Sequence, residues 1–174
     1  MKKKEVIELF VRYVILVALG IGNLWVFYFV FTPLTVFPVY WMLYLFGSGV
    51  KLLEGNIIFI SGIYAEIIPA CIAGAAYYLL LILNLSTPMK LNKRAKSIGF
   101  LLGVFLILNI SRILFFSALA INGVGYFDVA HELVWYFGST IMLVVVWFVN
   151  VWVFNIKSVP IYTDASNLIR EIKK

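Results

Sequence analysis

The sequence contains only one cysteine, Cys71, and one histidine, His131. A single cysteine excludes a disulfide within the chain, and it excludes a Cys-x-x-Cys motif of the redox or zinc-binding type. One thiol and one imidazole are also too few for a convincing transition-metal site, so we expect no metal and no other cofactor. Any reactivity of Cys71 and His131 is therefore expected from the individual side chains and not from a disulfide or a metal site.

Charged residues are scarce as well: Asp, Glu, Lys and Arg make up 13% of the 174 residues, whereas hydrophobic residues make up 64%. Ordinary soluble domains are about 45–50% apolar. The mean hydropathy of +1.04 and the long apolar runs predict an all-α integral membrane protein with a single domain over residues 1–174. The net charge of +6 does not indicate a nucleic-acid partner, because the basic residues flank apolar runs instead of forming a phosphate-binding face. The expected environment is the lipid bilayer.

Four apolar runs are long enough to cross a hydrocarbon core, which takes about 20 residues. Residues 34–47 are aromatic and contain Pro38, which predicts an interfacial helix or a re-entrant piece on the outer side and not a further span. Residues 50–66 contain Glu54-Gly55-Asn56 between apolar stretches, which predicts a small hairpin outside the membrane. The predicted transmembrane helices, about four in number, are residues 9–31, 67–85, 97–121 and 133–156.

Lysine and arginine cluster before the first predicted span, between the second and the third, and after the fourth. Because such clusters concentrate on the cytoplasmic side of membrane proteins, they predict cytoplasmic N- and C-termini, with residues 157–174 as a cytoplasmic tail. The predicted location is the cell membrane, with several passes. The acidic residues that then fall on the outer side are Glu54, Glu66, Asp128 and Glu132.

Three chemically distinctive side chains converge on the outer side in this topology. Cys71 lies about one turn inside the second span, and His131 lies at the outer start of the fourth. Arg112 lies deeper, about 13 Å from the outer end of the third span at ~1.5 Å per residue, but its long side chain can extend toward the surface. A charge inside a membrane is costly and usually marks a functional position. We therefore expect these residues to meet in the outer leaflet.

A thiol, a guanidinium and an imidazole are the components of a thiolate nucleophile site. Pro69 marks a helix start, which would place the Cys71 thiol near the positive end of a helix dipole and favour the thiolate. His131 beside a lone thiol favours an acid–base role. Asn109 stands one helical turn before Arg112 and can orient the guanidinium or donate to an oxyanion.

Each of these residues also has a structural alternative. Cys71 can be a small packed residue, and His131 an ordinary interfacial histidine. Arg112 can neutralise Glu66 or Asp128, or satisfy backbone carbonyls, and Asn109 can form an interhelical hydrogen bond. These alternatives favour a non-catalytic membrane scaffold or assembly factor, with Arg112 holding helices together.

The motifs resemble those of the exosortase/archaeosortase family. Cys71-x-x-Gly74 stands at the head of one span, Asn109-x-x-Arg112 in the next, and His131 follows. The resemblance covers most of the chain, from the hairpin region to the last span. Ile72 stands where bacterial members often have serine, and His131 stands where archaeal members often have a second arginine.

The resemblance implies a transpeptidase-like enzyme that processes surface proteins bearing a C-terminal motif, a transmembrane helix and a basic tail. It implies that Cys71 attacks a peptide carbonyl and forms a thioester, which a lipid head group then resolves. His131 would activate the thiol or protonate the leaving amine, and Arg112 would stabilise the thiolate or the oxyanion. The cargo, its motif, the lipid acceptor and the choice between hydrolysis and transfer stay open.

Overall fold

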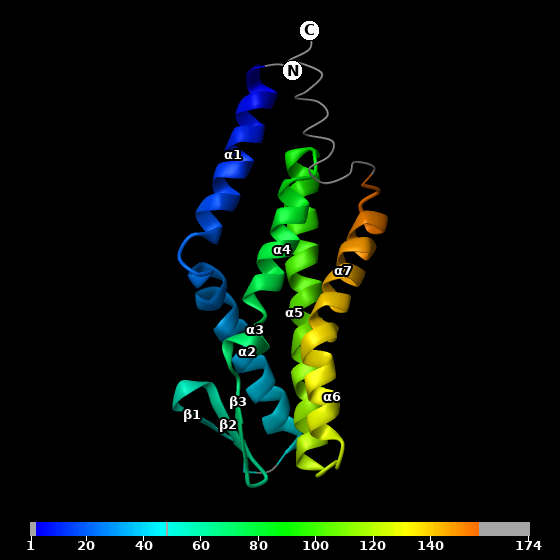
Figure 1. The fold of residues 1–174 in the computed structure, drawn as a ribbon. Coiled ribbons are helices and arrows are strands. Elements are labelled where there is room, and N and C mark those ends of the chain that lie inside the picture. The colour runs from blue at the N-terminus through cyan, green and yellow to red at the C-terminus, as the bar shows by residue number, and fades with distance from the viewer. Residues whose placement is uncertain (1–2, 48, 157–174) are drawn as a thin grey trace.

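The computed structural model describes residues 3–47 and 49–156, and these residues are mostly helical. The chain starts with α1 (Lys3–Gly20) and α2 (Trp25–Phe46), which a small sheet follows (Figure 1). The remaining helices are α3 (Pro69–Ile72), α4 (Gly74–Leu85), α5 (Leu91–Ile121), α6 (Phe127–Leu133), the π-helical turn η2 (Val134–Gly138) and α7 (Ser139–Val153). The predicted predominance of helix is confirmed, and the predicted tail at 157–174 lies outside the described residues.

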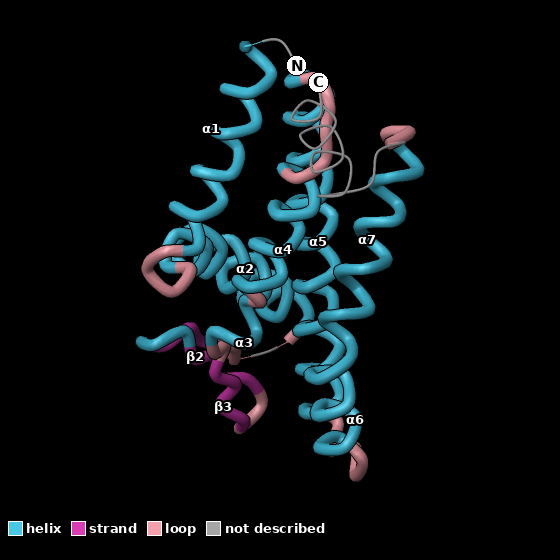
Figure 2. Tube along the Cα trace, turned by 45° about the horizontal axis from the view of Figure 1, so that its top comes forward, coloured by secondary structure: helices cyan, strands magenta, loops and turns pink. Residues whose placement is uncertain are grey.

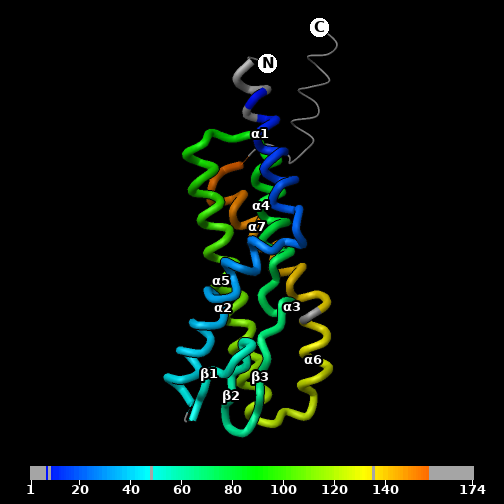
Figure 3. The backbone as a smooth tube through the Cα atoms, turned by 90° about the vertical axis from the view of Figure 1, so that its left-hand side faces the viewer, coloured from blue at the N-terminus to red at the C-terminus, as the bar shows by residue number. Residues whose placement is uncertain are grey.

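The helices run along the long axis of the molecule (Figure 1). α1 and α2 together lead from one end to the other, α3 and α4 return, α5 runs back, and α6 with α7 returns again. Helix α5 is the central element, in contact with α2, α4 and α7. The connection between α4 and α5 therefore lies at the same end as the start of α1, whereas the sheet and α6 lie at the opposite end (Figures 1 and 3).

In the part of the chain that the structure describes, three helical stretches are long and apolar enough to cross a membrane. Two of them, Leu91–Ile121 and Phe127–Val153, contain most of the predicted spans at 97–121 and 133–156. The third is Trp25–Phe46, and the apolar parts of α1 and of α3–α4 are shorter. The length and composition of these helices are compatible with the predicted membrane protein.

The predicted first span at 9–31 is not one helix, because α1 ends at Gly20 and α2 begins at Trp25. Between them Gly22, Asn23 and Leu24 have φ values of 84°, 55° and 60°. Glycine and asparagine enter this left-handed region most readily, and consecutive left-handed residues end a right-handed helix.

Residues 34–47 are not a separate interfacial helix, which corrects a second prediction. Helix α2 continues from Trp25 to Phe46 through Pro33 and Pro38. Proline removes a backbone hydrogen bond, but helices that pack against neighbours or lie in membranes tolerate the loss. The buried side chains in this half of the helix are Thr35, Val36, Val39 and Leu43.

The predicted span at 67–85 is interrupted at Ala73, which separates α3 from α4. Ala73 adopts a left-handed conformation with φ 59° and ψ 40°. Such a conformation costs an L-residue other than glycine on the order of 1–2 kcal/mol, so the surrounding packing must hold it in place. Cys71 therefore lies in a single isolated turn of helix.

The sheet is antiparallel with the order β1-β2-β3, formed by β1 (Lys51–Leu53), β2 (Ile57–Ile60) and β3 (Ile63–Glu66) (Figure 2). The predicted hairpin around Glu54-Gly55-Asn56 is confirmed, with Leu53 paired to Ile57. The third strand was not predicted. It is joined to β2 by Ser61 and Gly62, whose φ values of 49° and 85° match a two-residue turn with both residues left-handed.

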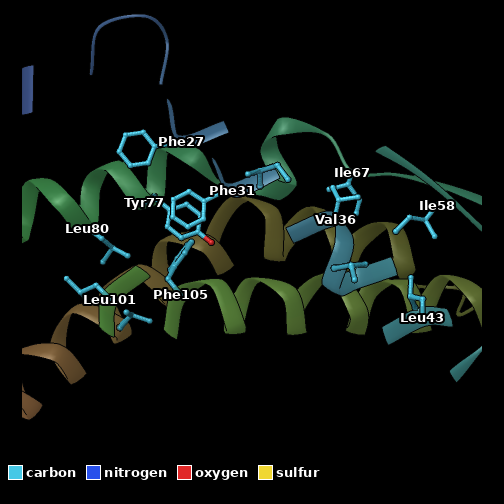
Figure 4. Close-up of a cluster of buried hydrophobic side chains, with 14 of the residues drawn as sticks. Phe27, Phe31, Val36, Leu43, Ile58, Ile67, Tyr77, Leu80, Leu101 and Phe105 are labelled. Atoms are coloured by element: carbon cyan, nitrogen blue, oxygen red, sulfur yellow. The ribbon is translucent and has the colours of Figure 1, made fainter. Parts of the chain in front are cut away.

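The core between α2, α4 and α5 is aromatic (Figure 4). The ring of Phe31 stacks on that of Tyr77 with centroids 3.6 Å apart, and Phe105 meets Tyr77 edge-on at 4.9 Å. Tyr77, Leu80, Leu101 and Phe105 are all fully buried. Because aromatic pairs add to the stabilisation from burial, this cluster fixes the three helices relative to one another.

A buried polar cluster lies between α4, α5 and α7. The amide of Asn84 donates to Ser97 Oγ at 2.6 Å, and Ser97 donates to Asn150 Oδ1 at 2.8 Å. Arg94 donates to the carbonyls of Asn84 and Thr87 at 2.8 and 2.9 Å, and it is only 7% exposed. Arg94 is therefore not a solvated loop cation: its guanidinium satisfies carbonyls that the end of α4 leaves free.

Candidate functional site

A cavity of about 480 Å³ lies at the end of the molecule that carries the sheet and α6. Its walls are mostly apolar, with Val39, Leu43, Ile58 and Phe116 among the lining residues. A mostly apolar pocket with a few polar groups is the usual form of a ligand site. The polar lining residues are Glu66, Cys71, Arg112, Ser117, His131 and Glu132. The structure thus brings Cys71, Arg112 and His131 to one cavity.

Cys71 is held by the short connection between β3 and α4. Strand β3 ends at Glu66 and α3 begins at Pro69, so the thiol follows the sheet closely. The Cys71 backbone amide donates to the carbonyl of Ile68 at 2.8 Å, and its thiol is free and half-buried. Because α3 is only four residues long, it supplies less dipole than the continuous helix predicted at 67–85. The helix dipole therefore stabilises a Cys71 thiolate less than the sequence predicted.

Gly74 of the Cys71-x-x-Gly74 motif has a packing role. A Cβ atom on Gly74 would lie 2.9 Å from atoms of the Tyr28 ring. Only a residue without a side chain lets Tyr28 of α2 pack this closely on the start of α4. The glycine therefore fixes the position of the turn that carries Cys71.

Asn109 reaches the same turn from α5. Its Nδ2 donates to the carbonyl oxygen of Cys71 at 2.8 Å, and its side chain is fully buried. Its Oδ1 has no hydrogen-bond partner among the described residues. Of the roles open to Asn109 from the sequence, the structure contains the interhelical hydrogen bond, and this bond positions Cys71.

Arg112 bridges α7 and the Cys71 turn. Its Nη1 donates to Ser139 Oγ at 2.5 Å, and its Nη2 approaches the carbonyl oxygen of Cys71 at 3.5 Å, the outer limit of a hydrogen bond. Within the described residues it forms no ion pair with the acidic side chains that the sequence offered as partners. Its positive charge therefore acts on the cavity together with the opposite charges of Glu66 and Glu132, which line the same cavity.

His131 lines the cavity from α6 and is exposed. Its ring stacks on Phe127 with centroids 5.4 Å apart and an interplanar angle of 8°, and it meets Phe116 edge-on at 5.2 Å. Its described contacts are thus aromatic, and the neighbouring carboxylates Asp128 and Glu132 do not orient the imidazole by a hydrogen bond. A role in proton transfer requires the ring to engage the substrate directly.

Two serines at the site were not predicted: Ser117, which lines the cavity, and Ser139, which binds Arg112. Ser139 is the more informative of the two. It follows η2, and a π-helical turn is a rare feature that often occurs at functional sites because it offsets the residues beyond it. The sequence offered only a weak signal, a hydroxyl in an apolar span that can partner an intramembrane arginine. Among the described residues, no group of three or more His, Cys, Asp or Glu side chains is placed to hold a metal ion.

No family model matches the chain, and neither a curated protein nor a solved structure matches it. The resemblance to exosortases and archaeosortases therefore depends on the motif residues of the sequence.

Proposed function

We propose that this protein is a membrane-embedded cysteine enzyme of the exosortase/archaeosortase type. Its substrates are surface proteins with a C-terminal motif, a transmembrane helix and a basic tail. The observation that carries the proposal is that Cys71, Arg112 and His131 come from separate segments and line one cavity. A protein that served only as a scaffold would have no need to bring a free thiol, a guanidinium and an imidazole to the same cavity.

In the proposed reaction the Cys71 sulfur attacks the carbonyl carbon of one peptide bond of the substrate. The C–N bond breaks, the amine leaves with the helix-bearing tail, and the acyl part stays on sulfur as a thioester. His131 takes the proton of the Cys71 thiol and gives it to the leaving amine, and Arg112 stabilises the negative charge on the thiolate or the oxyanion. A nucleophilic lipid head group, or water, then attacks the thioester carbonyl. His131 takes the proton of this nucleophile and returns it to sulfur, which restores the thiol.

The proposed topology has four crossings. α1 and α2 together make the first, and α3 with α4, α5, and α6 with α7 make the others. The basic connection between α4 and α5 faces the cytoplasm, and the cavity at the opposite end faces outward. A substrate tethered by its own transmembrane helix reaches this cavity at a high effective concentration.

The second candidate is the scaffold or assembly factor, and one observation favours it. Both Asn109 and Arg112 donate to the main-chain carbonyl of Cys71, which is how polar residues hold membrane helices together. A scaffold of this kind does not depend on the thiol itself. Loss of the thiol, with the main chain intact, therefore separates the two functions.

The test is a Cys71→Ala variant that replaces the native protein in its own host. Because alanine keeps the main-chain carbonyl, we expect the variant to stay folded in the membrane while substrate processing falls to background. Mass spectrometry of surface-protein C-termini measures the result: precursors that retain the apolar helix and basic tail should accumulate. Ser111→Ala, which removes a hydroxyl bonded to its own helix, is the matched control and should process normally. Processing at the wild-type rate in Cys71→Ala would favour the scaffold.

A further inference from the structure

The third strand of the sheet presents a free edge beside the cavity. The order β1-β2-β3 leaves β3 with a strand partner on one side only. Ile60 and Ile63 flank the two-residue turn and are a hydrogen-bonded pair, and such pairs alternate with unbonded ones along an antiparallel ladder. The bond from Ile67 N to Asn56 O at 3.1 Å continues the same alternation. The main-chain N–H and C=O groups of Tyr64 and Glu66 therefore point away from β2.

This edge leads directly to the reactive thiol. Ala65, Glu66, Ile67 and Ile68 all line the cavity that Cys71 lines. The main-chain bonds of the described turns and loops do not use Tyr64 or Glu66. Tyr64 is 68% exposed, so this edge is open, and the main-chain groups of an open strand edge are ready to pair with another chain. An extended peptide is the partner that supplies matching donors and acceptors at the spacing of a strand.

We propose that β3 is the substrate-binding edge: the residues that precede the scissile bond add to the sheet as a strand parallel to β3. This inference rests on the proposed cysteine mechanism, because the acyl part of the substrate stays bound to Cys71 and must be held there. A strand that runs parallel to β3 toward α3 delivers its C-terminal carbonyl to the thiol. The main-chain bonds impose no sequence, and alternate side chains face the apolar wall formed by Val39, Leu43 and Ile58.

The probe is N-acetyl-tetraalanyl chloromethyl ketone, applied to the purified full-length protein in detergent. The Cys71 sulfur displaces chloride and forms a thioether, and intact mass reports the adduct. Cys71→Ala is the control for alkylation of His131, because Cys71 is the one cysteine of the chain. N-methylation of every second amide removes one of the two alternating sets of donors. We expect methylation of the set that pairs with β3 to slow alkylation about thirtyfold, because two hydrogen-bond donors are lost, and methylation of the other set to have little effect. Equal rates for the unmethylated reagent and both methylated reagents would overturn the inference.

A matched pair of variants tests the strand itself. Tyr64→Pro removes an N–H that points to the free edge and leaves the ladder to β2 intact, whereas Tyr64→Ala removes only the aromatic ring. Tyr64→Pro should slow the tetraalanyl reagent about tenfold and leave iodoacetamide alkylation unchanged, and Tyr64→Ala should react like wild type. If folded Tyr64→Pro reacts at the wild-type rate, β3 is not the binding edge. If the variant does not fold, the methylated reagents on wild-type protein decide.

The two proposals fail in different experiments. The alkylation rates report whether a peptide docks beside Cys71, whatever the natural reaction is. Processing that persists in Cys71→Ala would remove the cysteine mechanism without changing the response to N-methylation. If processing is lost in Cys71→Ala but N-methylation has no effect, the cysteine mechanism stands and β3 is not the substrate-binding edge.

Discussion

Arg112 is the residue whose surroundings say most about the chemistry of the cavity. Its guanidinium spans Ser139 of α7 and the carbonyl of Cys71, and these two contacts use different nitrogens of the planar group. The weaker contact, at 3.5 Å, goes to the main chain next to the thiol. A guanidinium held firmly on one side and loosely on the other can turn toward a charge that develops at Cys71 during the reaction.

Arg112→Lys therefore keeps the charge and should lose most of the activity. Lysine places a compact ammonium where arginine offers a fork, so it cannot hold Ser139 and face Cys71 together. We expect substrate processing to fall by about 10²-fold, the usual effect of removing an oxyanion donor, when C-termini are quantified by mass spectrometry. Ser139→Ala is the companion variant, and a decrease of only a few-fold is expected because the guanidinium remains. Near-normal turnover in Arg112→Lys would mean that Arg112 acts as a simple charge.

At the scale of the element, the turn that carries Cys71 interrupts a stretch that the sequence pattern predicts to be one continuous span. Ala73 is left-handed, Gly74 has no room for a side chain, and Asn109 holds the Cys71 carbonyl from α5. The break separates the thiol from α4 and places it immediately after the sheet. The packing of α2 and α5 around the turn therefore determines where the thiol lies.

Gly74→Ala should destabilise the protein by about 1–3 kcal/mol, since the added methyl overlaps the Tyr28 ring and the ring must move. A lowered thermal unfolding midpoint in detergent is the expected measurement. Gly103→Ala is the matched control, because nothing lies within 4 Å of the added Cβ and alanine suits a helix interior. In a Tyr28→Ala background the penalty at Gly74 should shrink. Equal midpoints for Gly74→Ala and wild type would show that this contact does not fix the turn.

Long apolar stretches were the part of the fold that the sequence predicted well. α5 and α7 follow from hydropathy alone, because a helix through a membrane needs only length and apolar side chains. The breaks after Gly20 and at Ala73 were missed, since local left-handed conformations leave hydropathy unchanged. Pro38 suggested the end of an element, yet α2 continues through it because its neighbours supply packing.

The candidate site, like the fold, could be predicted only in part. That Cys71, Arg112 and His131 would share one region could be predicted from span order and charge placement. The partner of Arg112 could not, because it depends on the offset that η2 introduces before Ser139. The sequence also could not show whether Asn109 binds the main chain of Cys71 or instead orients Arg112 or an oxyanion. All of these roles require the same residue on the same helix face.

At the scale of the whole molecule, polar side chains gather near both ends of the helical bundle and an aromatic layer lies between them. The Asn84, Ser97 and Asn150 cluster lies on one side of the layer, and the Cys71 cavity lies on the other. The layer contains Tyr77 and Phe105, which are fully buried, so no described chain of polar groups connects the two regions. This separation suits a site open to one face of the membrane better than a path across it.

The topology can be tested by labelling introduced cysteines with a membrane-impermeant maleimide on intact cells. In a Cys71→Ala background, cysteines at positions 54 and 131 should react from outside, and cysteine at position 93 should react only after permeabilisation. The reason is the one-sided clustering of lysine and arginine. Labelling of position 93 in intact cells would show that the orientation, or the number of crossings, is wrong.

The most direct test of the cysteine mechanism is the covalent intermediate. Tagged enzyme is recovered from native membranes under denaturing, non-reducing conditions, and a substrate-sized mass increase at Cys71 is sought with and without hydroxylamine, which cleaves thioesters. The mechanism predicts a hydroxylamine-sensitive adduct that is absent in Cys71→Ala, and that accumulates in His131→Ala if the imidazole mainly activates the second nucleophile. An adduct that persists unchanged in Cys71→Ala would contradict Cys71 as the nucleophile. Uncleaved substrate without any adduct in His131→Ala would instead assign His131 to the first attack.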